Sequence, residues 1–147
     1  MKYWMSIIKG IIELNDKIFL NNKSIYSLYI NIKAKAIRCI NFYCRDYYED
    51  MKAIHNDFIN PLINVIAEIK PQEEFSKLTK VVLNYFKTIF EKKRTDSLNK
   101  DFLPYFIRTM IVPNMRITEK ELEDFEDNPN NFLRIELDEA DVESSKL

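Results

Sequence analysis

The chain has 147 residues, of which 46% are apolar and 31% are charged, and its formal net charge is −1. This composition excludes a disordered chain, because disorder needs low hydrophobicity and high net charge. The single glycine argues against a β-rich fold and leaves no material for a Gly-rich phosphate loop, which excludes P-loop and dinucleotide-binding enzymes. Two cysteines and one histidine cannot form an ordinary zinc site, and reduced thiols suit the cytosol or the nucleus. The longest uncharged run, residues 58–67, is far shorter than the roughly 20 residues that cross a bilayer, so we expect a soluble chain without a targeting segment.

Apolar residues recur with the 3.6-residue period of a helix in five successive stretches. The second stretch is the longest, and its apolar face runs through Leu28, Ile32, Ala36 and Ile40. The third contains Pro61, which removes a backbone donor and predicts a kink or a restart near residue 60. The expected helices run through Trp4–Ile12, from Ser24 to about Tyr48, through Met51–Ile69, from about Glu73 to Lys93, and from near Ser97 to Pro113.

Four of the predicted helix starts, near residues 24, 51, 73 and 97, make two antiparallel pairs offset by about fifty residues. A helix-turn-helix unit of roughly 40–47 residues is the period of HEAT and armadillo arrays. We therefore predict an all-α, HEAT-type α-solenoid over residues 1–117, a right-handed stack of two helix pairs behind a leading helix. A compact bundle of five helices is the alternative, and spacing alone does not separate the two.

Charge divides the chain into two segments. Residues 1–117 sum to +7, whereas residues 118–143 sum to −9. In the acidic segment, Thr118 with Glu121 predicts a capping box that opens a short helix. Asn128 followed by Pro129 predicts an N-cap and the first residue of a second short helix. We name residues 118–147 the acidic arm.

Two interpretations of the acidic arm compete. The first is a flexible, solvated terminus. The second is an ordered arm that packs through Phe125 and Phe132 and presents its carboxylates to a basic partner, which speeds association more than it adds affinity. Apolar residues at helical spacing favour the second, because a solvated tail has little use for them.

Other candidate residues give weaker signals. His55 has no triad partner and is typical of a surface or half-buried histidine, and Cys39 and Cys44 are expected to be core thiols. The tyrosines at 43, 47 and 48 are expected to serve packing. Basic residues form no tract, which argues against nucleic-acid binding. No carboxylate pair marks a catalytic site, so we expect no enzyme, no cofactor and no metal.

The end of the fifth helix carries a resemblance to a known family. The run Ile111–Met115, then Phe125–Asn128, then Phe132–Arg134 resembles a stretch of the CAS exportins, importin-β-like nuclear transport receptors that return importin-α to the cytoplasm. The resemblance extends over nearly the whole chain, and its last thirty-five residues are the specific part. One family feature is missing, because Ile135 and Glu136 stand where a second basic residue and an Asp are usual.

The resemblance implies a middle fragment of a solenoid that wraps Ran-GTP and importin-α and shuttles between nucleus and cytoplasm. It implies no cofactor and no membrane insertion, and an isolated fragment with uncovered ends is expected to self-associate. An importin-type receptor for other cargo and a non-transport HEAT scaffold are the alternatives. The acidic arm is expected to touch the partners through Glu123, Asp124, Glu126, Asp127, Arg134, Glu136, Asp138, Glu139 and Asp141.

Overall fold

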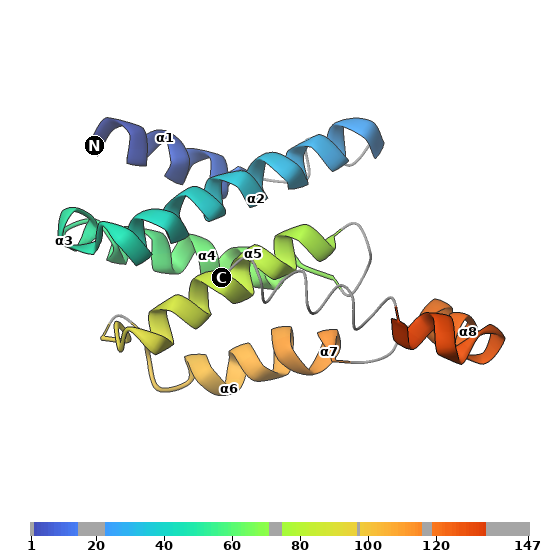
Figure 1. The fold of residues 1–147 in the computed structure, drawn as a ribbon. Helices are drawn as coiled ribbons and strands as arrows, with labels where there is room; N and C mark the ends of the chain where they lie inside the picture. Colours follow the sequence, from blue (N-terminus) through green and yellow to red (C-terminus); the bar gives the residue numbers. More distant parts are fainter. Residues whose placement is uncertain (1, 15–22, 71–74, 97, 116–118, 135–147) are drawn as a thin grey trace. The chain divides into compact units, whose positions relative to one another are not determined.

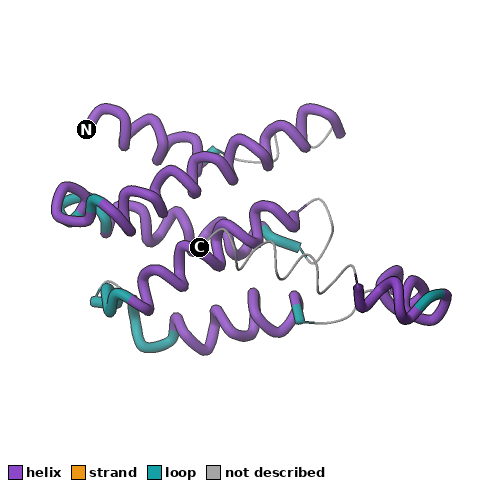
Figure 2. Tube along the Cα trace, viewed as in Figure 1, coloured by secondary structure: helices purple, strands orange, loops and turns teal. Residues whose placement is uncertain are grey.

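The computed structural model describes residues 2–14, 23–70, 75–96, 98–115 and 119–134, and the regular structure in these ranges is entirely helical (Figures 1 and 2). The predicted all-α, HEAT-like class is therefore confirmed. Two compact units make up the chain, residues 1–113 and residues 114–147.

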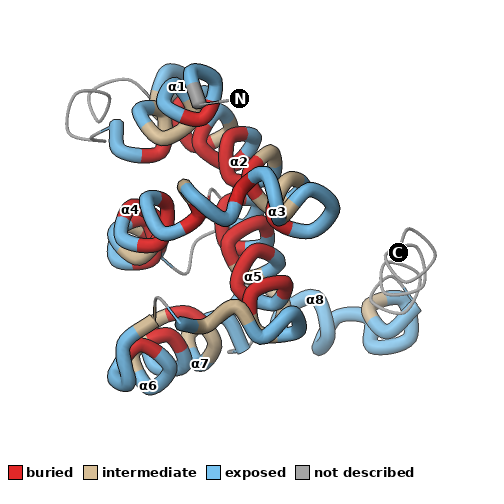
Figure 3. The backbone as a smooth tube through the Cα atoms, turned by 90° about the vertical axis from the view of Figure 1, so that its left-hand side faces the viewer, coloured by how far each residue is buried: buried red, intermediate tan, exposed pale blue. Residues whose placement is uncertain are grey.

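The helices of the first unit form two layers (Figure 3). One layer holds α1, α4 and α6, and the other holds α2 and α5. Helix α2 packs against both α1 and α5, while α4 packs against α1 and α5. Helices that occupy equivalent places in the layers start about fifty residues apart, as in a stack of helical repeats. The elements are α1 (Lys2–Glu13), α2 (Lys23–Asp46), α3 (Tyr48–Met51), α4 (Asn56–Glu68), α5 (Ser76–Glu91), α6 (Phe102–Phe106), the π-helical turn η3 (Ile107–Ile111) and α7 (Val112–Asn114).

One apolar cluster fills the space between the two layers. At the end of the cluster next to α6, the centroid of the Phe86 ring lies 4.9 Å from that of Phe102 and 5.0 Å from that of Phe106. Burial of each such side chain contributes roughly 1.5–3 kcal/mol to folding. The side chains with no more than 1% exposure include Ile12, Ile37, Ile40, Met51, Leu62, Val65, Ile66, Leu78, Val82, Tyr85 and Ile89.

The predicted apolar face of α2 is buried in its second half, at Ala36 and Ile40, but not in its first half. Leu28 and Ile32, which were expected in the core, are 59% and 41% exposed, whereas Tyr29 and Ile37 are buried. The predicted face was more than one residue wide, and α2 buries the side that meets α1 and α5. Leu28 and Ile32 lie on the edge of α2 that turns away from α5.

The predicted interruption at Pro61 is wrong in position. Helix α4 begins at Asn56 and continues through Pro61 to Glu68. The break lies between Met51 and Asn56, where the chain makes a series of turns. Pro61 stands early in α4, so its missing N–H leaves only the carbonyl one turn earlier without its usual partner, and the buried proline ring packs in the core.

The fifth helix contains a π turn that the sequence pattern did not reveal. The Val112 N–H donates to the Ile107 carbonyl, five residues earlier. A regular α-helix would bring the Pro113 ring against the Thr109 carbonyl, and the wider π turn lies immediately before that proline. Pro104 is tolerated because it is the third residue of α6, where no intrahelical donor is needed.

Helix α5 ends in a Schellman motif formed without glycine. The Lys93 N–H donates to the Phe90 carbonyl at 3.0 Å, and the Arg94 N–H donates to the Ile89 carbonyl at 2.9 Å. Lys93 has φ 54°, the left-handed conformation that this motif requires at the residue after the cap and that glycine adopts most readily. The motif turns the chain so that Arg94 points back toward α2.

This geometry predicts that Lys93→Gly stabilises the protein by about 0.5–1 kcal/mol, because glycine removes the steric cost of the left-handed backbone. Lys92→Gly is the matched control, since it removes the same charge at the preceding residue, where φ is −84°. We expect the control to lose stability. Urea unfolding measures both variants, and a Lys93→Gly protein as destabilised as the control contradicts the prediction.

Candidate functional site

The second unit presents the described part of the acidic arm. Helix α8 (Glu119–Asp127) carries Glu119 and Glu121 in its first turn, where carboxylates interact favourably with the helix dipole. Residues 129–134 form a second short helical segment. The Asn131 N–H donates to Asn128 Oδ1 at 3.1 Å, so Asn128 is the N-cap and Pro129 the first helical residue, as predicted. The expected capping residue Thr118 lies outside the described residues.

An aromatic contact holds the two short helices together. The rings of Phe125 and Phe132 meet edge to face, with centroids 5.7 Å apart. Pairs in this geometry contribute roughly 0.5–1.5 kcal/mol beyond their buried area. Packing of these rings on the helical repeats stays a prediction, and what the structure describes is their contact with one another.

Helix α8 separates its carboxylates from its apolar side chains. Glu123, Asp124, Glu126 and Asp127 are all exposed, and their spacing places them on the side of α8 away from Phe125. The four carboxylates therefore form one contiguous acidic surface. Such a surface attracts a basic partner at long range, and each exposed contact adds little free energy on its own.

The other predicted partner-binding residues are placed differently. Arg134 is exposed, and its guanidinium donates to Asn131 Oδ1 at 3.0 Å within the same short helix. Glu136, Asp138, Glu139 and Asp141 lie outside the described residues. Within the described ranges, no group of three or more His, Cys, Asp or Glu side chains is arranged to hold a metal ion.

A buried lysine joins three helices of the first unit. Lys33 is 1% exposed, and its ammonium donates to Leu14 O at 3.1 Å, Tyr29 Oη at 2.6 Å and Glu68 Oε2 at 2.6 Å. These three bonds satisfy all three ammonium donors. They tie the end of α1 and the end of α4 to the middle of α2. Lys33 is not among the residues predicted from the sequence, although a lysine between apolar residues in a helical pattern is a usable signal.

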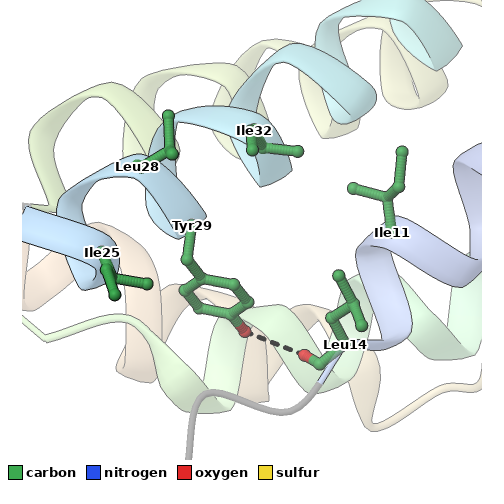
Figure 4. A pocket seen from close by; sticks show the side chains of 6 residues that line it. All are labelled: Ile11, Leu14, Ile25, Leu28, Tyr29 and Ile32. Carbon is green, nitrogen blue, oxygen red and sulfur yellow. Dashed lines mark hydrogen bonds between the residues drawn. The ribbon is translucent and has the colours of Figure 1, made fainter. Parts of the chain in front are cut away.

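An apolar pocket opens beside this lysine cluster (Figure 4). Its volume is about 110 Å³, and the Tyr29 hydroxyl at its wall donates to the Leu14 carbonyl at 2.8 Å. The hydroxyl is thereby occupied, and the rest of the lining is aliphatic. Without convergent polar groups, the pocket lacks what a specific small-molecule site requires. The lining residues are Ile11, Leu14, Ile25, Leu28, Tyr29 and Ile32.

A second buried network centres on His55. Its Nε2 lies 3.0 Å from the Tyr85 hydroxyl, and Tyr85 also interacts with the Cys44 thiol. Burial raises the pKa of Cys44 to about 11 and raises the pKa of Tyr85 well above its ordinary value, so both groups stay protonated. The predicted core thiol at Cys44 is confirmed, whereas Cys39 is only half-buried.

Arg94 closes this network from the α5–α6 connection. Its guanidinium donates to the Cys44 carbonyl near the end of α2, and its Cζ lies 3.5 Å from the centroid of the Tyr48 ring. A cation at a helix C-terminus offsets the partial negative charge of the free carbonyls. Burial lowers the pKa of His55, and the nearby Arg94 charge lowers it further. With 2% of its surface exposed, His55 is more deeply buried than the surface or half-buried histidine that was predicted.

This environment predicts a pH-dependent stability. The folded-state pKa of His55 lies below the 6.5 of an unperturbed histidine, so the unfolded chain binds the proton more readily. We expect the free energy of unfolding to be constant above about pH 7 and to fall as the pH drops below about 6.5. His55 is the single histidine of the chain, so His55→Gln, which retains a partner for the Tyr85 hydroxyl, should flatten this slope. Equal slopes for the two proteins in urea unfolding at several pH values contradict the prediction.

None of the described helices is long and apolar enough to span a bilayer. The candidate sites are an exposed acidic surface in the second unit and two buried hydrogen-bond networks in the first unit. The buried networks stabilise the repeats, and the carboxylates of α8 are exposed to solvent.

Comparison with known proteins identifies the family. A family model described as Cse1 matches residues 1–146. The chain is 21% identical over 149 residues to Exportin-2 of Oreochromis niloticus, and this alignment covers 99% of this chain and 15% of that protein. It is 24% identical over 117 residues to the Importin-alpha re-exporter of Schizosaccharomyces pombe, covering 78% of this chain and 12% of that protein. No solved structure matches the chain. It spans about one seventh of the length of these relatives, and because the Cse1 model covers both the helical repeats and the acidic arm, the chain belongs to the Cse1 family.

Proposed function

We propose that this chain is part of a nuclear export receptor that carries importin-α out of the nucleus in complex with Ran-GTP. The observation that carries the proposal is the match of the Cse1 model to residues 1–146, with relatives named Exportin-2 and Importin-alpha re-exporter. In this proposal, residues 1–117 are HEAT-type repeats and residues 118–147 are the acidic arm. The protein shuttles between nucleus and cytoplasm and works by binding rather than by catalysis.

The acidic surface of α8 supplies a physical role in this function. Glu123, Asp124, Glu126 and Asp127 present four exposed carboxylates to a partner rich in lysine and arginine. Ran and importin-α are the proposed partners. The receptor performs no chemistry on GTP, and differential binding of the two partners supplies the coupling between them.

A pull-down with the tagged full-length protein tests the proposal. We expect importin-α to be retained when Ran is loaded with GTP and to be lost when Ran is loaded with GDP. Retention of importin-α without Ran-GTP, or its release by Ran-GTP, points instead to an importin-type receptor. Absence of nucleotide-dependent Ran binding points to a HEAT scaffold outside transport.

The role of the arm has its own prediction. Reversing Asp124, Glu126 and Asp127 to lysine should lower the association rate with Ran-GTP and importin-α by about tenfold at low salt, because long-range attraction sets that rate. The rate should also become less sensitive to salt. Association rates measured at two ionic strengths check both effects.

The matched control reverses three exposed carboxylates of the repeats, Asp50, Asp96 and Asp101, to lysine. This control changes the net charge by the same amount outside the arm. If the arm variant and the control bind at the same rate with the same salt dependence, the arm is a solvated spacer.

A further inference from the structure

The second layer of the first unit exposes one broad surface. Helices α2 and α5 pack side by side, and α1, α4 and α6 lie on the opposite side of this layer (Figure 3). The exposed stripes of α2 and α5 therefore face the same way, away from the first layer. Side chains on the two stripes belong to a single surface although they are about fifty residues apart in the sequence.

This surface is basic on both helices. On α2, Lys35, Arg38 and Arg45 are exposed at the spacing of one helical face, and Phe42 lies on the same face between the two arginines. On α5, the exposed stripe contains Lys77, Lys80 and Lys87. We name these seven residues the basic-aromatic face: Lys35, Arg38, Phe42, Arg45, Lys77, Lys80 and Lys87.

Carboxylates of the described residues pair with two of these cations. Asp46 hydrogen-bonds the neighbouring Arg45 at 3.0 Å, and Glu91 lies 3.9 Å from Lys87. Even without Lys80, the other five cations outnumber these two carboxylates, so the described part of the face keeps an excess of positive charge in a chain whose overall charge is −1. An exposed face of an ordinary solvated helix mixes the two signs.

Helix α4, in the first layer, does not share this charge. The exposed residues of α4 carry one carboxylate, three amides and no cation. The basic surface of α2 and α5 thus has no counterpart on α4. The exposed residues of α4 are Asn56, Asp57, Asn60, Asn64 and Ala67.

An aromatic cluster lies at one end of the basic surface. Phe42 is 45% exposed and Tyr47 is 49% exposed, and their ring centroids are 5.5 Å apart. Tyr43 completes the cluster, with its ring centroid 5.7 Å from Phe42 and 5.8 Å from Tyr47. Aromatic rings and arginines are the side chains that most often dominate protein–protein binding, and here they are adjacent.

We propose that the basic-aromatic face is a docking surface for an acidic protein segment that places one apolar side chain against Phe42. Carboxylates of such a segment match the excess positive charge of the face, and the aromatic cluster supplies the apolar contact. A single aromatic cluster at one end suits one apolar anchor, whereas single-stranded nucleic acid stacks successive bases on aromatics distributed along its path. The inference goes beyond the proposed function, in which the acidic arm binds basic partners.

Fluorescence anisotropy with the 147-residue chain tests the docking surface. The probe is a labelled peptide in which glutamate and aspartate flank one phenylalanine, and a second peptide has serine in place of that phenylalanine. We expect the first peptide to bind, and its affinity to fall by about tenfold between 50 and 200 mM NaCl, since exposed charges are screened by salt. The chain should bind the peptide more tightly than it binds oligothymidylate or phosphatidylserine vesicles.

Two pairs of charge reversals of identical chemistry test the location. Lys35→Glu with Lys87→Glu lies on the face, and Lys52→Glu with Lys100→Glu lies outside it at exposed positions of the connections. The first pair should weaken binding of the peptide by about tenfold and the second by less than about twofold, because attraction between charges on the surface depends on their separation. Circular dichroism melting of both variants checks that the fold is retained.

Phe42→Ser tests the apolar anchor. It should weaken binding of the phenylalanine peptide by about fivefold and leave binding of the serine peptide unchanged, which a double-mutant comparison resolves. The proposal is overturned if the two lysine pairs weaken binding equally, or if Phe42→Ser affects the two peptides equally. It is also overturned if oligothymidylate or vesicles bind more tightly than the peptide.

Discussion

The packing of α2 against α5 is the contact on which the rest of the first unit depends. It is the most extensive contact between helices of this unit, and it forms the layer against which α1 and α4 are placed. An isolated helical pair cannot bury its apolar faces, so successive pairs must stack. The stacking of α2 and α5 therefore defines both the core and the surface that the unit presents to solvent.

Two polar networks fasten the edges of this layer. The Lys33 cluster joins α1 and α4 to α2, and the Arg94 and His55 network joins the end of α2 to α5 and to the connection that follows it. Each of these polar groups would cost free energy if it were buried without a partner. Because the groups are paired, they fix the relative position of the helices. The two networks lower the free-energy cost of burying an ionisable group in different ways. Lys33 is paired with the carboxylate of Glu68, whereas burial favours the neutral form of His55.

Charge of each sign is also gathered on a separate surface. The described part of the acidic arm gathers carboxylates on one side of α8, and the α2–α5 layer gathers cations on its outward face. A chain with a net charge of −1 thus offers two strongly charged surfaces of opposite sign. Surfaces of this kind select partners and accelerate association, and their effects weaken as salt rises.

Local patterns in the sequence were sufficient for the helices, the two charge segments and the cap at Asn128, because each depends on residues within one or two helical turns. The resemblance at Ile111–Met115 and Phe125–Arg134 likewise lies in contiguous residues, and the family match bears it out. Only the tertiary structure decided which edge of α2 is buried, since that depends on where α1 and α5 pack. The same holds for the partners of Lys33, the burial of His55 beside Tyr85, and the gathering of Lys35 and Lys87 on one face. Apart from the bond between Lys33 and Tyr29, these features join residues 19 to 52 positions apart, and no helical period carries information over that separation.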